Sequence, residues 1–291
     1  MSFENRINER SHVSLEGEAA RLCVRDRRRL TYSVRGYIRW RHDRCTEVEN
    51  RPLKMENIEE FVDERQKSWC VHCGRVLAGA VVNRDHIPSK SLLLEPYPKN
   101  LPRMATCKSC NEGFSLDEEY LVAFLGSVLA GTTEPDRQQI PRAARILDRS
   151  LKLRERVESA KSEYLGQDGT TRRIWTPEVK RVERVVLKNA RGHAFFEYGE
   201  PMLNEPSRIW FAPLETLTVQ DREAFENVRF GDGWPEVGSR MMTRVMTGQD
   251  LVDGWVMVQA NVYRYAVAQI GTILVRSVLF EYLATEVSWH E

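Results

Sequence analysis

The chain has 291 residues, of which 42% are hydrophobic and 29% are charged, a composition that can bury a substantial core without disulfide staples. Its formal net charge of +1 argues against a protein that is basic throughout. No apolar run reaches the roughly 18 residues that a membrane span requires, and the N-terminus has no apolar signal-peptide core. We therefore expect a soluble cytoplasmic protein without a membrane partner, whose cysteines are reduced.

Charge is distributed unevenly along the chain. The first segment, residues 1–54, is rich in arginine and weakly periodic, so we expect an N-terminal extension that is flexible or forms a small helical addition. A second basic region covers residues 137–191, whereas the residues after His193 are mainly acidic. This asymmetry fits a polyanion partner on one part of the surface and a protein partner on the acidic C-terminal region, although solvated charged faces would produce the same pattern.

Residues 55–130 begin with a short expected helix at 56–63, followed by a strand-like run from Arg75 to Val82. A proline-rich loop and a short apolar stretch at 101–104 come next. Ser115 and Glu118 have the spacing of a capping box, and the apolar residues from Tyr120 onward recur at helical intervals. The pattern predicts the order strand, loop, strand, helix.

The rest of the chain mixes helical and strand patterns. We expect one amphipathic helix from Pro141 to about Tyr164 and another from Thr176 that stops at Gly192. The first carries a basic stripe of Arg142, Arg145, Arg149, Lys152 and Arg156. Strands are expected at 208–212, 255–268 and 272–279, which are rich in β-branched and aromatic residues. The predicted fold class is α+β.

The most specific motif is a pair of CxxC sequences, Cys70–Cys73 and Cys107–Cys110. Four thiolates complete a closed tetrahedral site, which is the usual form of a structural zinc site. Free buried cysteines are the alternative, and redox activity is disfavoured because neither motif lies in a thioredoxin-like strand-to-helix context. Two further cysteines, Cys23 and Cys45, are left unassigned.

The dipeptide Asp85-His86 lies between these motifs, and Asn111 directly follows Cys110. A lone histidine is more often a surface or packing residue than a catalyst, so its position carries the prediction. If a helix begins near residue 107, Cys107, Cys110 and Asn111 occupy neighbouring positions on it, and zinc would fix the helix that carries Asn111. Asp85 and Asn111 offer hard oxygen ligands, which suit Mg²⁺ or Mn²⁺ rather than zinc.

In this combination the chain resembles the HNH nucleases of the ββα-metal fold, in the variety with a four-cysteine structural zinc. The resemblance covers residues 65–130 and is carried by Cys70-Val-His-Cys73, Asp85-His86-Ile87-Pro88, Asn100-Leu101 and Cys107-Lys-Ser-Cys110-Asn111. It implies that Asp85 and Asn111 hold one divalent cation, that His86 is the general base and that Asn100 helps to fix the His86 loop. His72 matches no catalytic position. Many relatives carry a lysine three residues after the final asparagine, where this chain has Phe114.

We therefore expect an HNH nuclease module at 55–130, a basic helical segment at 131–192 and an α+β region at 193–291. The expected activity is metal-dependent endonucleolytic cleavage of DNA, double- or single-stranded, in phage defence, restriction or mobile elements. Two alternatives remain open. One is a zinc-stabilised nucleic-acid-binding module, which needs neither His86 nor Asn111; the other is an interaction protein that recruits a partner through its acidic C-terminal region.

Overall fold

The computed structural model describes residues 66–165, 171–228, 235–269, 271 and 273–289. The arginine-rich segment 1–54 and the helix expected at 56–63 lie outside this range. The described residues form helices and antiparallel sheets, which confirms the α+β class. No helix among them is long and apolar enough to cross a membrane.

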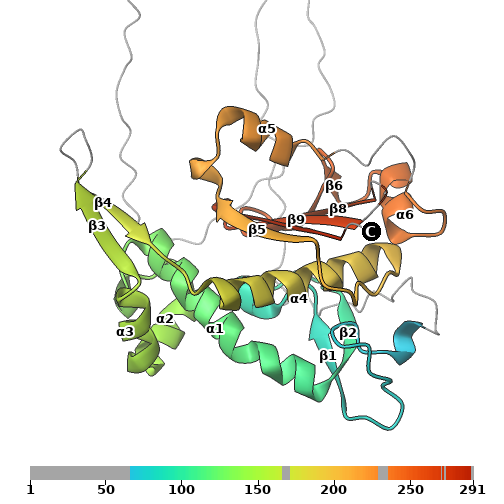
Figure 1. Ribbon diagram of the computed structural model, residues 1–291, viewed down its shortest axis with the longest axis horizontal. Helices are drawn as coiled ribbons and strands as arrows, with labels where there is room; N and C mark the ends of the chain where they lie inside the picture. The colour runs from blue at the N-terminus through green and yellow to red at the C-terminus, as the bar shows by residue number, and fades with distance from the viewer. Residues whose placement is uncertain (1–65, 166–170, 229–234, 270, 272, 290–291) are drawn as a thin grey trace, which may run out of the picture. The chain divides into compact units, whose positions relative to one another are not determined.

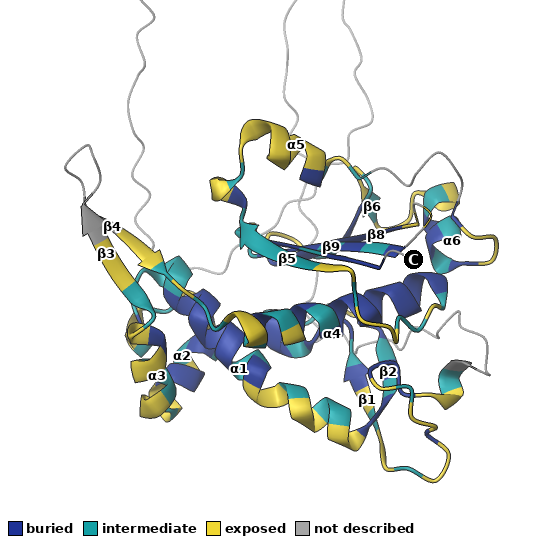
Figure 2. Cartoon of the chain, in the orientation of Figure 1, coloured by how far each residue is buried: buried dark blue, intermediate teal, exposed yellow. Residues whose placement is uncertain are grey.

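Helix α4 (Val179–Tyr198) lies between two layers of the structure (Figure 1). On one side it packs against α1 (Lys108–Ala130), and on the other against a six-stranded sheet. Every residue from 188 to 198 is buried, as Figure 2 shows by the dark blue C-terminal half of this helix. A helix buried on all sides usually has only apolar residues, so the polar side chains of α4 require partners inside the protein.

The expected helix stop at Gly192 is wrong. Helix α4 continues for six residues to Tyr198 and ends at Gly199, whose φ of 77° is the left-handed conformation that glycine adopts most easily. Gly192 has a packing role instead, because a Cβ atom at this position would lie 3.0 Å from Cγ1 of Ile87. The glycine allows α4 to approach the residue that directly follows the Asp85-His86 dipeptide.

The sheet has a purely antiparallel arrangement that includes the expected strand at 208–212. In spatial order its strands are β5 (Arg208–Pro213), β10 (Leu283–Ser288), β9 (Ile273–Leu279), β8 (Tyr263–Gln269), β7 (Trp255–Gln259) and β6 (Leu251–Val252). The expected strand at 255–268 is divided into β7 and β8 by a turn in which Asn261 has φ of 60°. Asparagine tolerates this left-handed conformation better than most residues, which locates the turn.

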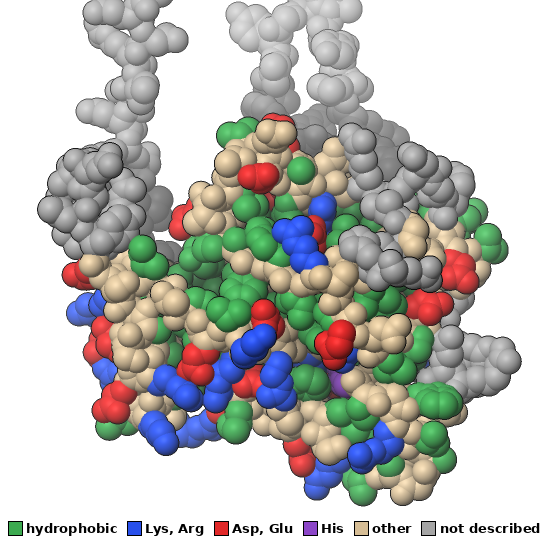
Figure 3. Space-filling view, in the orientation of Figure 1, with side chains coloured by type: hydrophobic (Ala, Val, Ile, Leu, Met, Phe, Trp, Pro, Cys, Tyr) green, Lys and Arg blue, Asp and Glu red, His purple; other side chains and the backbone are tan. Residues whose placement is uncertain are grey.

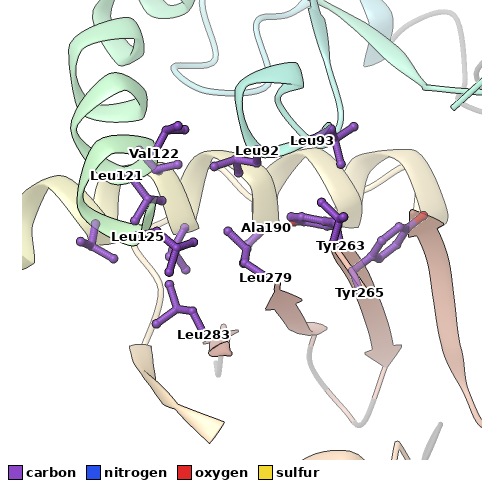
Figure 4. Packing of buried hydrophobic residues seen from close by; sticks show 14 of the residues in the cluster. Leu92, Leu93, Leu121, Val122, Leu125, Ala190, Tyr263, Tyr265, Leu279 and Leu283 are labelled. Carbon is purple, nitrogen blue, oxygen red and sulfur yellow. The ribbon is translucent and has the colours of Figure 1, made fainter. Parts of the chain in front are cut away.

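Alternate residues of the strands pack into two separate hydrophobic clusters. Tyr263 and Tyr265 of β8 point toward α4 and join the main core, part of which is drawn in Figure 4. Ala266 lies on the opposite face, in a smaller cluster with Phe225 of α5 (Val219–Glu226). Because both faces of the sheet are covered, its central strands are buried along most of their length.

The single helix expected from Pro141 to about Tyr164 is divided into α2 (Pro141–Arg149) and α3 (Leu151–Glu158), followed by a hairpin of β3 (Lys161–Leu165) and β4 (Thr171–Trp175). The break is at Ser150, whose side chain caps α3 by accepting a hydrogen bond from Leu153 N at 3.3 Å. The basic residues of this segment are therefore not on one continuous helix face. Within the expected basic stripe, Arg149 pairs with Glu119 and Arg156 pairs with Glu178.

A buried polar network connects α4 to the sheet and to α6 (Arg240–Thr247). His193 Nε2 lies 2.9 Å from Tyr263 Oη, and the His193 ring stacks on Tyr265. Tyr265 and Arg244 both donate hydrogen bonds to the carboxylate of Glu197, which is fully buried. Burial, reinforced by the nearby Arg244 guanidinium, lowers the pKa of His193 to about 3. His193 is therefore neutral in the folded protein at physiological pH.

This pKa shift predicts a pH-dependent stability. Because an unfolded histidine titrates near pH 6.5, the unfolded chain binds more protons at residue 193 than the folded protein between that pH and about pH 3. The contribution of neutral His193 is complete above pH 6.5 and is lost as the pH falls, at about 1.4 kcal/mol per pH unit. His193→Gln retains a hydrogen-bonding group for Tyr263 and should remove this dependence. Urea unfolding of both proteins between about pH 5.5 and 7 measures it, and parallel slopes would contradict the assignment.

Candidate metal centre and adjacent acidic site

The candidate site is built on a short hairpin and the helix that follows it. Strand β1 (Val82–His86) pairs antiparallel with β2 (Arg103–Cys107), which continues directly into α1. This reproduces the expected order of strand, loop, strand and helix. The first strand begins later than expected, because residues 77–80 form a turn after an isolated bridge between Trp69 and Val76.

The expected capping box at Ser115 and Glu118 is wrong. The N-cap of helix α1 is Cys107, eight residues before Ser115. The Ser115 hydroxyl donates to the carbonyl of Glu112 at 2.8 Å, one turn back along the helix. Glu118 takes part in tertiary contacts that are described below.

The four cysteines of the two CxxC motifs lie together in one cluster. Their sulfur atoms are all within 4.8 Å of one another, and those of Cys73 and Cys107 are 3.8 Å apart. The first motif forms a tight turn in which the amides of Cys73 and Gly74 both donate to Cys70 O. Gly74 completes this turn with φ of 68°, which explains why a glycine follows the motif.

This cluster can hold a metal ion such as zinc. Tetrahedral zinc with bonds of about 2.3 Å places its sulfur ligands about 3.8 Å apart, which fits the spacing between Cys73 and Cys107. Although burial raises the pKa of Cys107, hydrogen bonds from Ser109 and from the backbone of Cys110 hold it at about 6 and favour the thiolate. Burial and the neighbouring thiols raise the pKa of Cys110 above its usual range, because crowded thiolates without a cation repel one another.

Asp85 is buried on β1 and lies beside two other buried side chains. Its Oδ2 atom lies 2.8 Å from the Lys188 ammonium and 3.8 Å from His72 Nε2, a distance too long for a hydrogen bond. Burial by itself would raise the pKa of Asp85, but the His72 ring and the Lys188 charge outweigh it and hold the pKa below its usual range. Asp85 is therefore a carboxylate at neutral pH.

Lys188 links Asp85 to α1. Its ammonium group also contacts Glu118 and lies 2.9 Å from the hydroxyl of Ser89. Glu118 accepts two further hydrogen bonds, from Ser89 Oγ at 2.7 Å and from Ser91 Oγ at 3.0 Å. Three segments that are far apart in the sequence thus meet at one buried polar cluster behind Asp85.

His72 belongs to the first CxxC motif and is buried beside Asp85. Its ring contacts Phe114 of α1 edge-on, with centroids 5.0 Å apart, and within the described residues neither ring nitrogen has a hydrogen-bond partner. Burial lowers the pKa of His72 more than the nearby Asp85 raises it. The sequence resemblance assigned no role to this residue, but it is the side chain that lies nearest to Asp85 from the first CxxC motif.

His86 is the last residue of β1 and is half-buried. It pairs across the hairpin with Arg103, so both side chains project from the same face of the two strands. Burial, together with the charges of Lys90 and Arg103, lowers the pKa of His86 to about 4. Its Nε2 atom is buried and makes no hydrogen bond to any other part of the chain that the structure describes.

Asn111 lies half-buried in the first turn of α1, one residue after Cys110. Phe114 and Glu118, three and seven positions later, share its helix face. This is the face of α1 that contacts His72, through Phe114, and Lys188 of α4, through Glu118. Lys188 also pairs with Asp85, so this face borders the polar cluster around the Asp85 carboxylate.

Asn100 is exposed in the loop before β2. The hydrogen bonds that hold the loop after His86 come from other residues. Ile87 N donates to Pro102 O at 3.0 Å, and Ser89 N donates to the Asn189 side chain at 2.9 Å. Asn189 and Lys188 lie 100 and 99 positions from Ser89, which both contact, so no local sequence pattern could have identified them.

Charged groups around the site are mostly paired. On the face shown in Figure 3, Lys and Arg side chains alternate with Asp and Glu rather than forming a uniform basic surface. Arg184 of α4 contacts the Phe114 ring and pairs with Asp117, 2.6 Å away. In the acidic C-terminal region, Arg264 makes a bidentate pair with Glu226.

Comparison of the chain with models of known families, with curated proteins and with solved structures finds no match.

Proposed function

We propose that the protein is a metal-dependent endonuclease of the HNH type that hydrolyses phosphodiester bonds in DNA. The observation that carries this proposal is the combination of the β1–β2 hairpin with α1. Asp85 and His86 end the first strand, the second strand runs through Cys107 into the helix, and Asn111 lies in the first turn of that helix, one residue after Cys110. This order of elements supports the proposal, because the resemblance to the ββα-metal nucleases implies the same order.

The donor atoms fit a hard divalent cation. Asp85 is an ionised carboxylate and Asn111 provides an amide oxygen, both of which suit Mg²⁺ or Mn²⁺. When bound there, the cation would neutralise the negative charge that develops on the phosphate during cleavage. The four cysteines would hold a structural zinc, which fixes α1 and hence Asn111 without taking part in the chemistry.

His86 has the position of a general base. It follows Asp85 directly, its ring is half-buried, and one of its nitrogens has no partner within the described residues. A neutral imidazole in this position accepts the proton of the attacking water, and Asp85 and Asn111 would hold the cation that binds the phosphate. None of these groups recognises a DNA nucleobase, so any sequence specificity depends on other parts of the chain.

One observation favours a second candidate, a zinc-stabilised DNA-binding module without catalysis. The ion pair with Lys188 already occupies one oxygen of Asp85, and a cation must therefore bind beside a lysine ammonium. A cleavage assay separates the two candidates. Supercoiled plasmid and single-stranded DNA are incubated with the zinc-loaded protein, with and without Mg²⁺ or Mn²⁺, beside an Asp85→Asn variant.

The nuclease should nick plasmid only when the divalent cation is present, and Asp85→Asn should lose this activity while it retains zinc. Folded protein that binds DNA but cuts it with neither cation would overturn the nuclease proposal and leave the binding module. Cleavage that is equal in Asp85→Asn would show that a contaminating nuclease or another site is responsible.

A further inference from the structure

Lys188 is an unusual residue to find beside a proposed metal ligand. Its side chain is only 4% exposed, and lysine is almost never buried to this extent unless its charge is paired. Here the ammonium has three acceptors, one each from Asp85, Glu118 and Ser89, which match its three N–H donors. The lysine is therefore a fixed part of the site and not a mobile surface charge.

The contact is confined to one side of the Asp85 carboxylate. Lys188 and His72 both approach Oδ2, from α4 and from the first CxxC motif. A cation approaching Asp85 is repelled least on the Oδ1 side, away from the ammonium. The hydrogen bond to Lys188 also prevents the carboxylate from rotating, so Oδ1 keeps one direction.

Lys188 also determines the charge of the cluster. The two carboxylates of Asp85 and Glu118 and the one ammonium of Lys188 give these three side chains together a net charge of −1. Without the ammonium, Asp85 and Glu118 would form a doubly negative site. Such a site would bind a divalent cation more tightly, but would not hold it at one defined position.

We propose that Lys188 is a positioning residue for the metal site: it fixes Asp85 through Oδ2, directs Oδ1 toward the cation and keeps the affinity for that cation low. This inference rests on the proposed function, because it assumes that Asp85 is a ligand of the catalytic cation. It also assigns a role to α4, since this helix supplies both Lys188 and the Asn189 side chain that holds the loop after His86.

The test measures Mn²⁺ binding in the absence of DNA, by electron paramagnetic resonance of the free ion, in the full-length zinc-loaded protein. Lys188→Met should bind Mn²⁺ more tightly, on the order of tenfold, because a positive charge next to the ligand is removed. At saturating Mn²⁺ the same variant should cleave plasmid on the order of 10- to 100-fold more slowly, because Asp85 is no longer held in one orientation. A purely structural role would not combine tighter binding with slower turnover.

Two further variants keep the test informative if Lys188→Met fails to fold. Glu118→Gln retains the lysine and lowers the negative charge, so it should bind Mn²⁺ on the order of tenfold more weakly. The double variant Lys188→Met with Glu118→Gln restores the net charge of −1, so its Mn²⁺ affinity should return toward that of the unmodified protein while cleavage stays slow. Lys180→Met is the matched control, because Lys180 is on the same helix and its side chain is 93% exposed.

The outcomes distinguish this inference from the proposed function. Mn²⁺ binding that is lost in Asp85→Asn but is the same in the Lys188 and Glu118 variants would overturn the role of Lys188 and leave the nuclease proposal intact. If the unmodified protein and every variant show no Mn²⁺ binding that depends on Asp85, the metal site itself is wrong and both proposals fail.

Discussion

Replacement of Cys110 by serine is expected to remove the bound zinc and to unfold the hairpin and the N-terminal part of α1. The serine hydroxyl is a poor zinc ligand, and the remaining three sulfurs cannot close a tetrahedral site. Zinc binding in small zinc-finger peptides contributes roughly 10 to 16 kcal/mol, and this energy is also folding energy. Since whole domains are stable by only about 5 to 15 kcal/mol, loss of the ion should unfold this region of the protein.

Elemental analysis of purified protein and thermal unfolding measure this effect together. The unmodified protein should contain about one zinc per chain, which mild chelation leaves in place, because a closed thiolate site competes better than an oxygen site. Ser115→Ala is the matched control, as Ser115 is exposed on the same helix and lies outside the cluster. A folded unmodified protein without zinc would show that the four cysteines are not a zinc site.

Replacement of His86 by alanine is expected to lower the rate of DNA cleavage by on the order of 10² to 10⁴, which is the usual contribution of a general base. Zinc content, folding and DNA binding should be retained, because His86 is not among the four cysteines and makes no Nε2 hydrogen bond within the described residues. The assay is plasmid nicking under single-turnover conditions, with DNA binding measured separately. His193→Gln, which changes a histidine of the C-terminal network, is the control.

Asn111→Ala provides the comparison that separates a ligand from a base. This variant should also lose most of its cleavage, but a higher Mn²⁺ concentration should restore part of it, because the defect is weaker cation binding. No concentration of Mn²⁺ should restore His86→Ala. If His86→Ala cuts plasmid as fast as the unmodified protein at matched metal concentration, His86 is not the base and the mechanism is wrong.

Features that depend on near neighbours in the sequence could be predicted. The two CxxC motifs need only local turns to present their sulfurs, and the cluster of four cysteines confirms that prediction. The order of strand, loop, strand and helix, and the α+β class, follow from hydrophobic periodicity over a few residues. The nuclease activity, its cation and the DNA partner depend on the resemblance alone and stay predictions.

Errors occurred where a tertiary contact competed with a local signal. Glu118 has the spacing of a capping residue, yet it pairs with the buried Lys188 ammonium in the interior of a helix that begins at residue 108. Gly192 has the character of a helix stop, but it lies inside α4 because the Ile87 side chain needs the space that a Cβ atom would occupy. Local propensities are worth at most about 1 kcal/mol per residue, which such contacts can exceed.

The environment of Asp85 could not be deduced from the chain alone. Asp85 and Lys188 are separated by 103 positions, and they meet because α4 is buried between α1 and the sheet. That burial leaves a lysine with almost no access to water, and the ammonium must therefore pair with the carboxylates that the hairpin and α1 present. Sequence spacing predicted which residues bind metals, whereas the packing of α4 determined that Oδ2 of Asp85 is already engaged by Lys188.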